Sequence, residues 1–135
     1  MNFNSNLIAF NDAKTENYAA FNLNYNSGYI SNMFQNTIYL RENNSGQNSI
    51  GFYNDEDSYI SFVGNIVGMK GTSTAYPVYI YTTSTLKEVD NNTFNISGFS
   101  SEYWALGTTS FGNFSGWKSS SDVGPGERFL NPVFK

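Results

Sequence analysis

The sequence predicts an all-β protein, an antiparallel β-sandwich of the jelly-roll type, with a small β-barrel as the alternative. Three observations lead to this fold class. Apolar and polar residues alternate with the two-residue period of a strand. Several short stretches are rich in β-branched and aromatic residues, which fit a half-buried sheet. Turn-forming residues separate these stretches at intervals of about 8 to 12 residues, a spacing typical of sandwiches and barrels.

The first strand signal is the segment from Ala19 to Asn26, where Phe21, Leu23 and Tyr25 alternate with asparagines. Four further strands are predicted at 36–41, 48–53, 58–64 and 76–83. The polar turns 42–47 and 54–57 join the first three of these four, so we expect an antiparallel meander over 36–64. Pro77 has no backbone donor, which predicts an edge strand or the first position of a strand.

Helix signals are weak. The segment Thr85–Glu88 has the spacing of a capping box, and 12–20 could hold one short turn. No repeat period is visible that would predict a trefoil, propeller or solenoid. We therefore expect a single β domain over 1–135, in which 123–135 forms an extended C-terminal tail because it is rich in Gly and Pro.

Composition excludes several classes of function. The chain has 135 residues with no Cys and no His, which excludes thiol chemistry, His-dependent triads and the usual zinc sites. The net charge is −4 and the seven basic residues are scattered singly, so no nucleic-acid partner is expected. The sequence shows no membrane span and no signal-peptide pattern, and it predicts no cofactor.

The carboxylates of the chain do not form a recognisable catalytic or metal-binding pattern. Glu102, next to Tyr103 and Trp104, is the best candidate for a glycosidase acid, but no second carboxylate can be assigned opposite it. The acidic segments 54–57 and 90–95 lack the glycine and the final glutamate of an EF-hand. We therefore predict neither catalytic residues nor a metal site, and we interpret both segments as soluble turns.

The segment Ser101–Asp122 contains both tryptophans among glycines, serines and threonines. Alternation places Trp104 in the core. Because Gly112 and Gly116 disfavour a helix, the later rings are expected on a loop or bulged strand, with Trp117 the most exposed. Such rings can present a face to a ligand or plug the open end of the fold, and we favour plugging. If the protein binds a sugar, the predicted ligand-binding residues are Phe111, Asn113, Phe114, Ser115 and Trp117.

These observations favour a non-enzymatic structural protein, such as a virion surface or capsid decoration subunit that forms a homo-oligomer or a larger assembly. The predicted subunit contacts are the apolar tail residues Phe129, Leu130, Val133 and Phe134. A lectin-like carbohydrate-binding module is the alternative, and a small glycoside hydrolase comes third. The expected location is the virion or the extracellular surface, with the cytoplasm as the alternative.

Overall fold

The structure is a computed structural model of the chain. It describes residues 2–13, 18–23, 30–42, 48–54, 59–80, 86–106, 108–120 and 123–129. Strands dominate the described residues, so the predicted all-β class is confirmed. No helix among them is long and apolar enough to cross a membrane.

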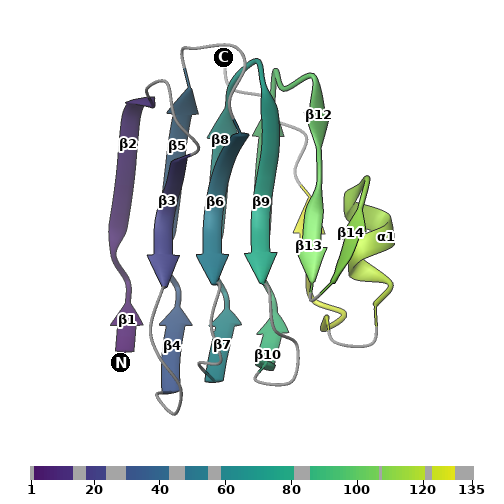
Figure 1. The fold of residues 1–135 in the computed structure, drawn as a ribbon. Coiled ribbons are helices and arrows are strands. Elements are labelled where there is room, and N and C mark those ends of the chain that lie inside the picture. Colours follow the sequence, from purple (N-terminus) through teal and green to yellow (C-terminus); the bar gives the residue numbers. More distant parts are fainter. Residues whose placement is uncertain are drawn as a thin grey trace.

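The strands form three sheets, which we call A, B and C (Figure 1). Sheet A contains β1 (Asn2–Asn4), β4 (Ile30–Phe34), β7 (Tyr59–Val63) and β10 (Leu86–Asp90). Sheet B contains β2 (Leu7–Ala13), β5 (Thr37–Glu42), β8 (Ile66–Lys70), β11 (Thr93–Ser97) and β15 (Arg128–Phe129). Sheet C contains β3 (Tyr18–Leu23), β6 (Asn48–Asn54), β9 (Thr74–Ile80), β12 (Ser101–Glu102), β13 (Trp104–Leu106) and β14 (Thr109–Phe111).

The chain visits sheets A, B and C in turn and then starts the next circuit, so each circuit is one coil of a parallel β-solenoid. Coil 1 is β1 to β3, coil 2 is β4 to β6, coil 3 is β7 to β9, and coil 4 is β10 to β13. Successive coils pair in parallel in all three sheets, and they follow one another from left to right in Figure 1. Only the β13–β14 pair is antiparallel among the described strands.

The predicted antiparallel sandwich is therefore wrong in its strand pairing. The strands expected at 36–41, 48–53, 58–64 and 76–83 correspond to β5, β6, β7 and β9, although Ser58 and 81–83 lie outside the described residues. However, β5, β6 and β7 lie in three different sheets, so the meander over 36–64 does not form. The prediction that no solenoid repeat exists is also wrong. The alternation of apolar and polar residues shows which residues face inward, but it does not show which strands are neighbours.

Two local predictions are also corrected. Thr85 of the capping-box segment lies outside the described residues, but Leu86 to Glu88 belong to strand β10 rather than to a helix, and Val89 of this strand is buried in the core. Pro77 lies inside β9, which is central because β6 and β13 flank it. The ladder register passes over Gly51 and Pro77 together, and a Cβ on Gly51 would lie 2.7 Å from the Pro77 oxygen. The missing proline donor is thus accommodated at a local irregularity that glycine permits.

The core consists of apolar columns that run along the solenoid, because parallel in-register pairing stacks equivalent positions of successive coils. In sheet B, Ile38 lies over Val67, which lies over Phe94. In sheet A, Met33, Phe62 and Val89 form a similar column. All six of these side chains are at most 1% exposed.

A short helix covers one end of this core. Helix α1 (Phe114–Lys118) begins after Asn113, whose side-chain oxygen accepts a hydrogen bond from the Gly116 nitrogen. The Trp117 ring lies 5.1 Å from Trp104 and 5.5 Å from Phe94 between ring centroids, and it is 0% exposed. The expectation of a helix-free loop with an exposed Trp117 is therefore wrong, because the last coil needs an aromatic lid.

Candidate functional site

A ladder of asparagines fixes the corner between sheets A and B in every coil. Its members are Asn6, Asn36, Asn65 and Asn92, separated by 30, 29 and 27 residues. The side-chain nitrogens of Asn6, Asn36 and Asn65 each donate to the side-chain oxygen of the next asparagine at 2.9 to 3.0 Å. The backbone nitrogens of the first three members donate to the same oxygens at 2.9 to 3.0 Å.

Each buried asparagine also donates to the preceding coil. The side-chain nitrogens of Asn36, Asn65 and Asn92 reach the carbonyl oxygens of Phe3, Met33 and Phe62 at 2.7 to 2.8 Å. These three asparagines are 0% exposed, and burying an amide costs free energy unless its hydrogen-bonding groups are satisfied, as they are here. The residue before each member, Ser5, Gln35, Gly64 or Asn91, has a φ of 56° to 68°, which makes the corner tight.

Glu127 occupies the fifth rung. Asn92 donates its side-chain nitrogen to Glu127 Oε1 at 2.8 Å, and the Arg128 nitrogen donates to the Asn92 carbonyl as in the coils before. Glu127 is 1% exposed, and its Oε2 atom has no hydrogen-bond partner. Burial raises the pKa of this carboxyl to about 7, although the hydrogen bonds from Asn92 oppose the shift.

The two ends of the solenoid differ. At the end of coil 4, α1 and the segment 123–129 cover the core, with Val123 and Glu127 buried. At coil 1, each of β1, β2 and β3 is the outermost described strand of its sheet (Figure 1). The ladder ends there at Asn6, which is exposed, unlike the next three members.

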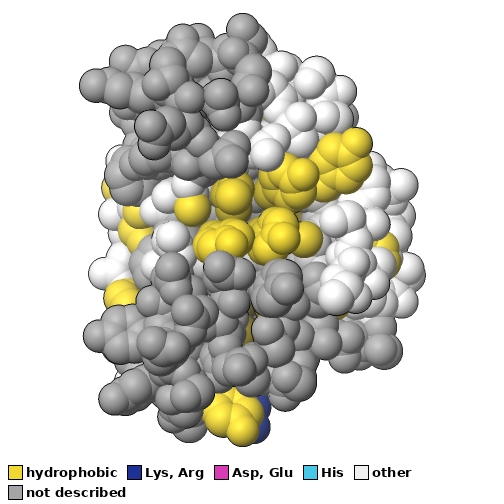
Figure 2. Space-filling view, viewed as in Figure 1, with side chains coloured by type: hydrophobic (Ala, Val, Ile, Leu, Met, Phe, Trp, Pro, Cys, Tyr) yellow, Lys and Arg dark blue, Asp and Glu magenta, His cyan; other side chains and the backbone are white. Residues whose placement is uncertain are grey.

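Sheet C carries a cluster of tyrosines on its outer face, which we call the tyrosine face: Tyr53, Tyr76, Tyr79 and Tyr103. Tyr53 pairs in register with Tyr79, and Ile50 with Tyr76. The cluster therefore extends across successive coils, along the solenoid axis. Figure 2 looks onto this face and shows hydrophobic side chains gathered across its middle. The described charged side chains that show in this view lie at its lower border.

The rings of the tyrosine face contact one another. The centroid distances are 5.0 Å for Tyr53–Tyr79, 5.9 Å for Tyr76–Tyr79 and 5.7 Å for Tyr76–Tyr103, and the last pair is stacked. Tyr103 is 40% exposed. Burial raises the pKa of the Tyr76 phenol, and the phenols of Tyr103 and Tyr79 raise it further, so Tyr76 stays a protonated donor at neutral pH.

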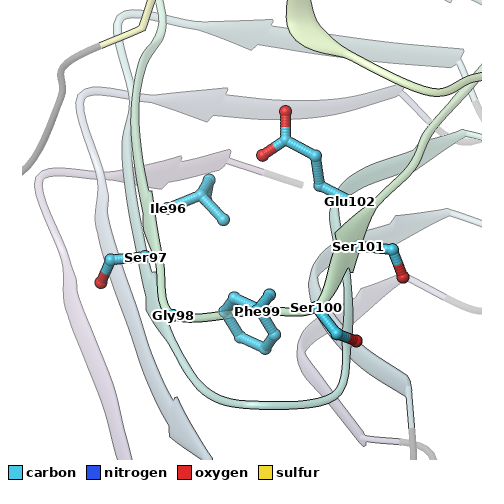
Figure 3. A pocket seen from close by; sticks show the side chains of 7 residues that line it. All are labelled: Ile96, Ser97, Gly98, Phe99, Ser100, Ser101 and Glu102. Carbon is cyan, nitrogen blue, oxygen red and sulfur yellow. The ribbon is translucent and has the colours of Figure 1, made fainter.

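A pocket of about 230 Å³ lies at the corner between β11 and β12 and is lined by the consecutive residues 96–102. Figure 3 shows the side chains of Ile96 and Glu102 pointing toward each other across it, with Phe99 at its base, whereas Ser97 and Ser101 point away. Glu102 Oε1 accepts a long hydrogen bond of 3.4 Å from Trp104 Nε1. Glu102 is the only carboxylate in this lining, whereas glycoside hydrolysis requires two.

The structure brings the predicted ligand-binding residues together, but in the lid rather than in a binding loop. Phe111 and Phe114 pack against the core, Asn113 caps α1, and Ser115 is exposed on it. Trp117 is buried and has no free ring face for a ligand.

The predicted subunit contacts are only partly described. Phe129 is 36% exposed, and its ring centroid lies 5.5 Å from that of Phe114 of the same chain. Leu130, Val133 and Phe134 lie outside the described residues, as do Asp55 to Asp57 of the first acidic segment. In the described part of the chain, no group of three or more acidic residues could hold a metal ion.

Sequence reasoning missed the ladder and the tyrosine face, although a signal for the ladder was present. Asn6, Asn36, Asn65 and Asn92 each begin a similar stretch, NLIAF, NTIYL, NIVGM and NTFNI. Aligning these stretches would have revealed a repeat of about 30 residues of the kind that solenoids show.

The chain matches no protein-family model, no curated protein and no solved structure.

Proposed function

We propose that the chain is a non-enzymatic structural subunit that joins a larger assembly through the open end of coil 1. The observation that supports this most directly is the contrast between the two ends of the solenoid. One end has a lid built around Trp117, whereas the other leaves three strand edges without a described neighbour. Solenoids need covered ends for solubility, and an open sheet edge is a template for pairing.

The edge of β2 offers backbone groups that have no partner among the described residues, and they follow a defined pattern. The Thr37 nitrogen donates to the Asn6 carbonyl, so that carbonyl faces coil 2. Backbone groups of successive residues in a strand point to opposite neighbours, so the N–H and C=O groups of Leu7 and Ala9 face the open end. Leu7 is also 75% exposed, the highest value among the exposed large hydrophobic residues that the structure describes.

The occupant that we propose for this edge is the same edge of a second copy. Two copies that meet by their open ends are related by a two-fold axis, which closes the assembly and leaves the lids outside. A head-to-tail arrangement would instead need the lid end of the neighbour, where α1 covers the core. A virion surface or capsid decoration subunit is one role that such a paired module would fit.

The test compares two substitutions at the same position of different coils. Leu7 and Ile66 occupy equivalent places in β2 and β8, and both are exposed, at 75% and 47%. Leu7→Lys should reduce the native mass measured by light scattering at tens of micromolar, because it places a charge at the paired edge. Ile66→Lys should leave the native mass unchanged, and both variants should keep the wild-type melting temperature.

A second variant blocks the backbone directly. Ala9→Pro removes an N–H group that faces the open end, without removing a bond to β5. It should also lower the native mass. A wild-type protein that is monomeric at these concentrations, or an equal loss of mass in Ile66→Lys, would contradict the proposed interface.

A further inference from the structure

We propose that the tyrosine face binds a neutral carbohydrate chain. This inference goes beyond the assembly proposal, because it concerns a different surface and does not depend on coil 1. It also moves the sugar-binding site away from the lid, where Trp117 is fully buried.

The rings of the tyrosine face are held in place before any ligand binds. Tyr76 contacts both Tyr79 and Tyr103, and Tyr79 contacts Tyr53, so every ring has an aromatic neighbour within 6 Å between centroids. A tyrosine fixed in this way offers a large amphipathic contact with little loss of side-chain entropy on binding. Tyr103 has one ring neighbour on this face and is 40% exposed, so its ring offers the best surface for stacking on a sugar.

Neutral polar side chains surround the rings of the tyrosine face. Asn48, Thr74 and Ser101 form an in-register row on the same sheet, and the Thr74 and Ser101 hydroxyls lie 3.1 Å apart. Exposed Asn22 lies in register with Tyr53 on the other side. These groups supply neutral donors and acceptors, which suit sugar hydroxyls.

No charged side chain shows in the described part of the tyrosine face (Figure 2). Phosphate backbones and charged peptides are recognised through lysines and arginines or through carboxylates. A neutral polyhydroxylated ligand needs rings and hydrogen-bonding groups instead. Because the rings span coils 2 to 4, the matching ligand is an oligosaccharide aligned with the solenoid axis rather than a single sugar.

The experiment is native affinity electrophoresis of the full chain in gels that contain one soluble polysaccharide each. The neutral probes are glucomannan, galactomannan, xyloglucan and mixed-linkage β-glucan, and alginate serves as the anionic comparison. We expect at least one neutral polysaccharide to retard the protein more strongly than alginate does. Tyr103→Ala and Tyr79→Ala should weaken the affinity measured from that retardation about fivefold, since losing one stacking contact removes roughly 1 kcal/mol.

Tyr59→Ala is the matched control. Tyr59 is 38% exposed, but it lies on β7 of sheet A, where Lys87 Nζ is 4.3 Å from its ring centroid. This variant should bind like the wild type, and so should Leu7→Lys, which separates this proposal from the assembly proposal. Melting temperatures identify any variant that fails to fold, and exposed Tyr103 makes its alanine variant the safer of the two.

Three results would overturn the proposal. Retardation by none of the neutral polysaccharides would exclude this ligand class. Equal weakening in Tyr59→Ala would show that the effect is not specific to this face. A lower native mass in Tyr103→Ala, with no retardation of the wild type, would instead identify the face as a contact between protein subunits.

Discussion

Glu127→Gln should remove most of the pH dependence that the fifth rung gives to folding. Glu127 takes the place of an asparagine in the ladder but carries a carboxyl group that is 1% exposed. Its Oε1 accepts from Asn92, whereas Oε2 has no partner. Asp90 disfavours the charged form, and Lys118 on α1 favours it. Glutamine gives this rung the neutral amide chemistry of the other four.

The expected size follows from the pKa values of the two states. The pKa of this carboxyl rises from 4.5 to about 7 on folding, so the folded state binds the proton more tightly. The contribution of Glu127 to stability is therefore fully present below pH 4.5 and is lost as the pH rises through about 7. A shift of this size corresponds to about 3 kcal/mol between the acidic and alkaline limits.

The assay is urea unfolding of both proteins from about pH 5 to about pH 8.5, followed by tryptophan fluorescence. Trp117 belongs to the lid, its ring centroid lies 5.1 Å from that of Trp104 in the core, and Lys118 Nζ donates to the Glu127 carbonyl at 2.6 Å. The free energies of unfolding should be similar at pH 5, and the variant should be more stable by about 2 to 3 kcal/mol at the alkaline end. Parallel pH profiles for the two proteins would refute the reasoning, because they would mean that Glu127 ionises normally in the folded state.

Two further predictions concern the ladder and catalysis. Asn65→Ala leaves the Asn36 nitrogen, one Asn36 amide hydrogen and the Met33 carbonyl without their partners, so it should cost roughly 3 to 9 kcal/mol in urea unfolding. Asn6→Ala, at the exposed end of the same ladder, should cost about 1 kcal/mol or less, and equal losses would contradict a ladder that stabilises by burial. The wild type should hydrolyse none of a panel of poly- and oligosaccharides. Hydrolysis that disappears in Glu102→Gln would overturn the non-enzymatic proposal.

The sequence predicted the strands but not their partners. Strands β5, β6, β7 and β9 form at the stretches 36–41, 48–53, 59–64 and 76–80 because their residue types favour a half-buried pleated surface. That preference is the same in parallel and antiparallel sheets. The deciding information is the spacing of Asn36, Asn65 and Asn92, whose burial has no explanation in a sandwich but follows directly from stacked coils.

The lid could not be predicted from local sequence for a different reason. Gly116 in the middle of a five-residue helix is unfavourable on propensity alone. Tertiary contacts reverse this preference, because Trp117 gains ring contacts with Trp104 and Phe94 at the end of the core. Those contacts exist only once coil 4 is in place, so a window of neighbouring residues does not contain the information.

The four clustered tyrosines lie on one of the three outer faces, and the requirements of folding explain only part of this placement. Inward positions must be apolar to fill the columns, but outward positions are free of that constraint. An outward row of sheet A contains Asn32, Ser61 and Glu88, and one of sheet B contains Leu7, Thr37, Ile66 and Thr93. In sheet C the equivalent positions of coils 2 to 4 are mostly aromatic. Cross-strand ring pairs stabilise a sheet by roughly 0.2 to 1 kcal/mol each, so folding alone explains part of this pattern. All three sheets could gain that stabilisation, yet among the described residues the outward ring contacts are concentrated on sheet C. The proposed carbohydrate-binding surface would account for this asymmetry.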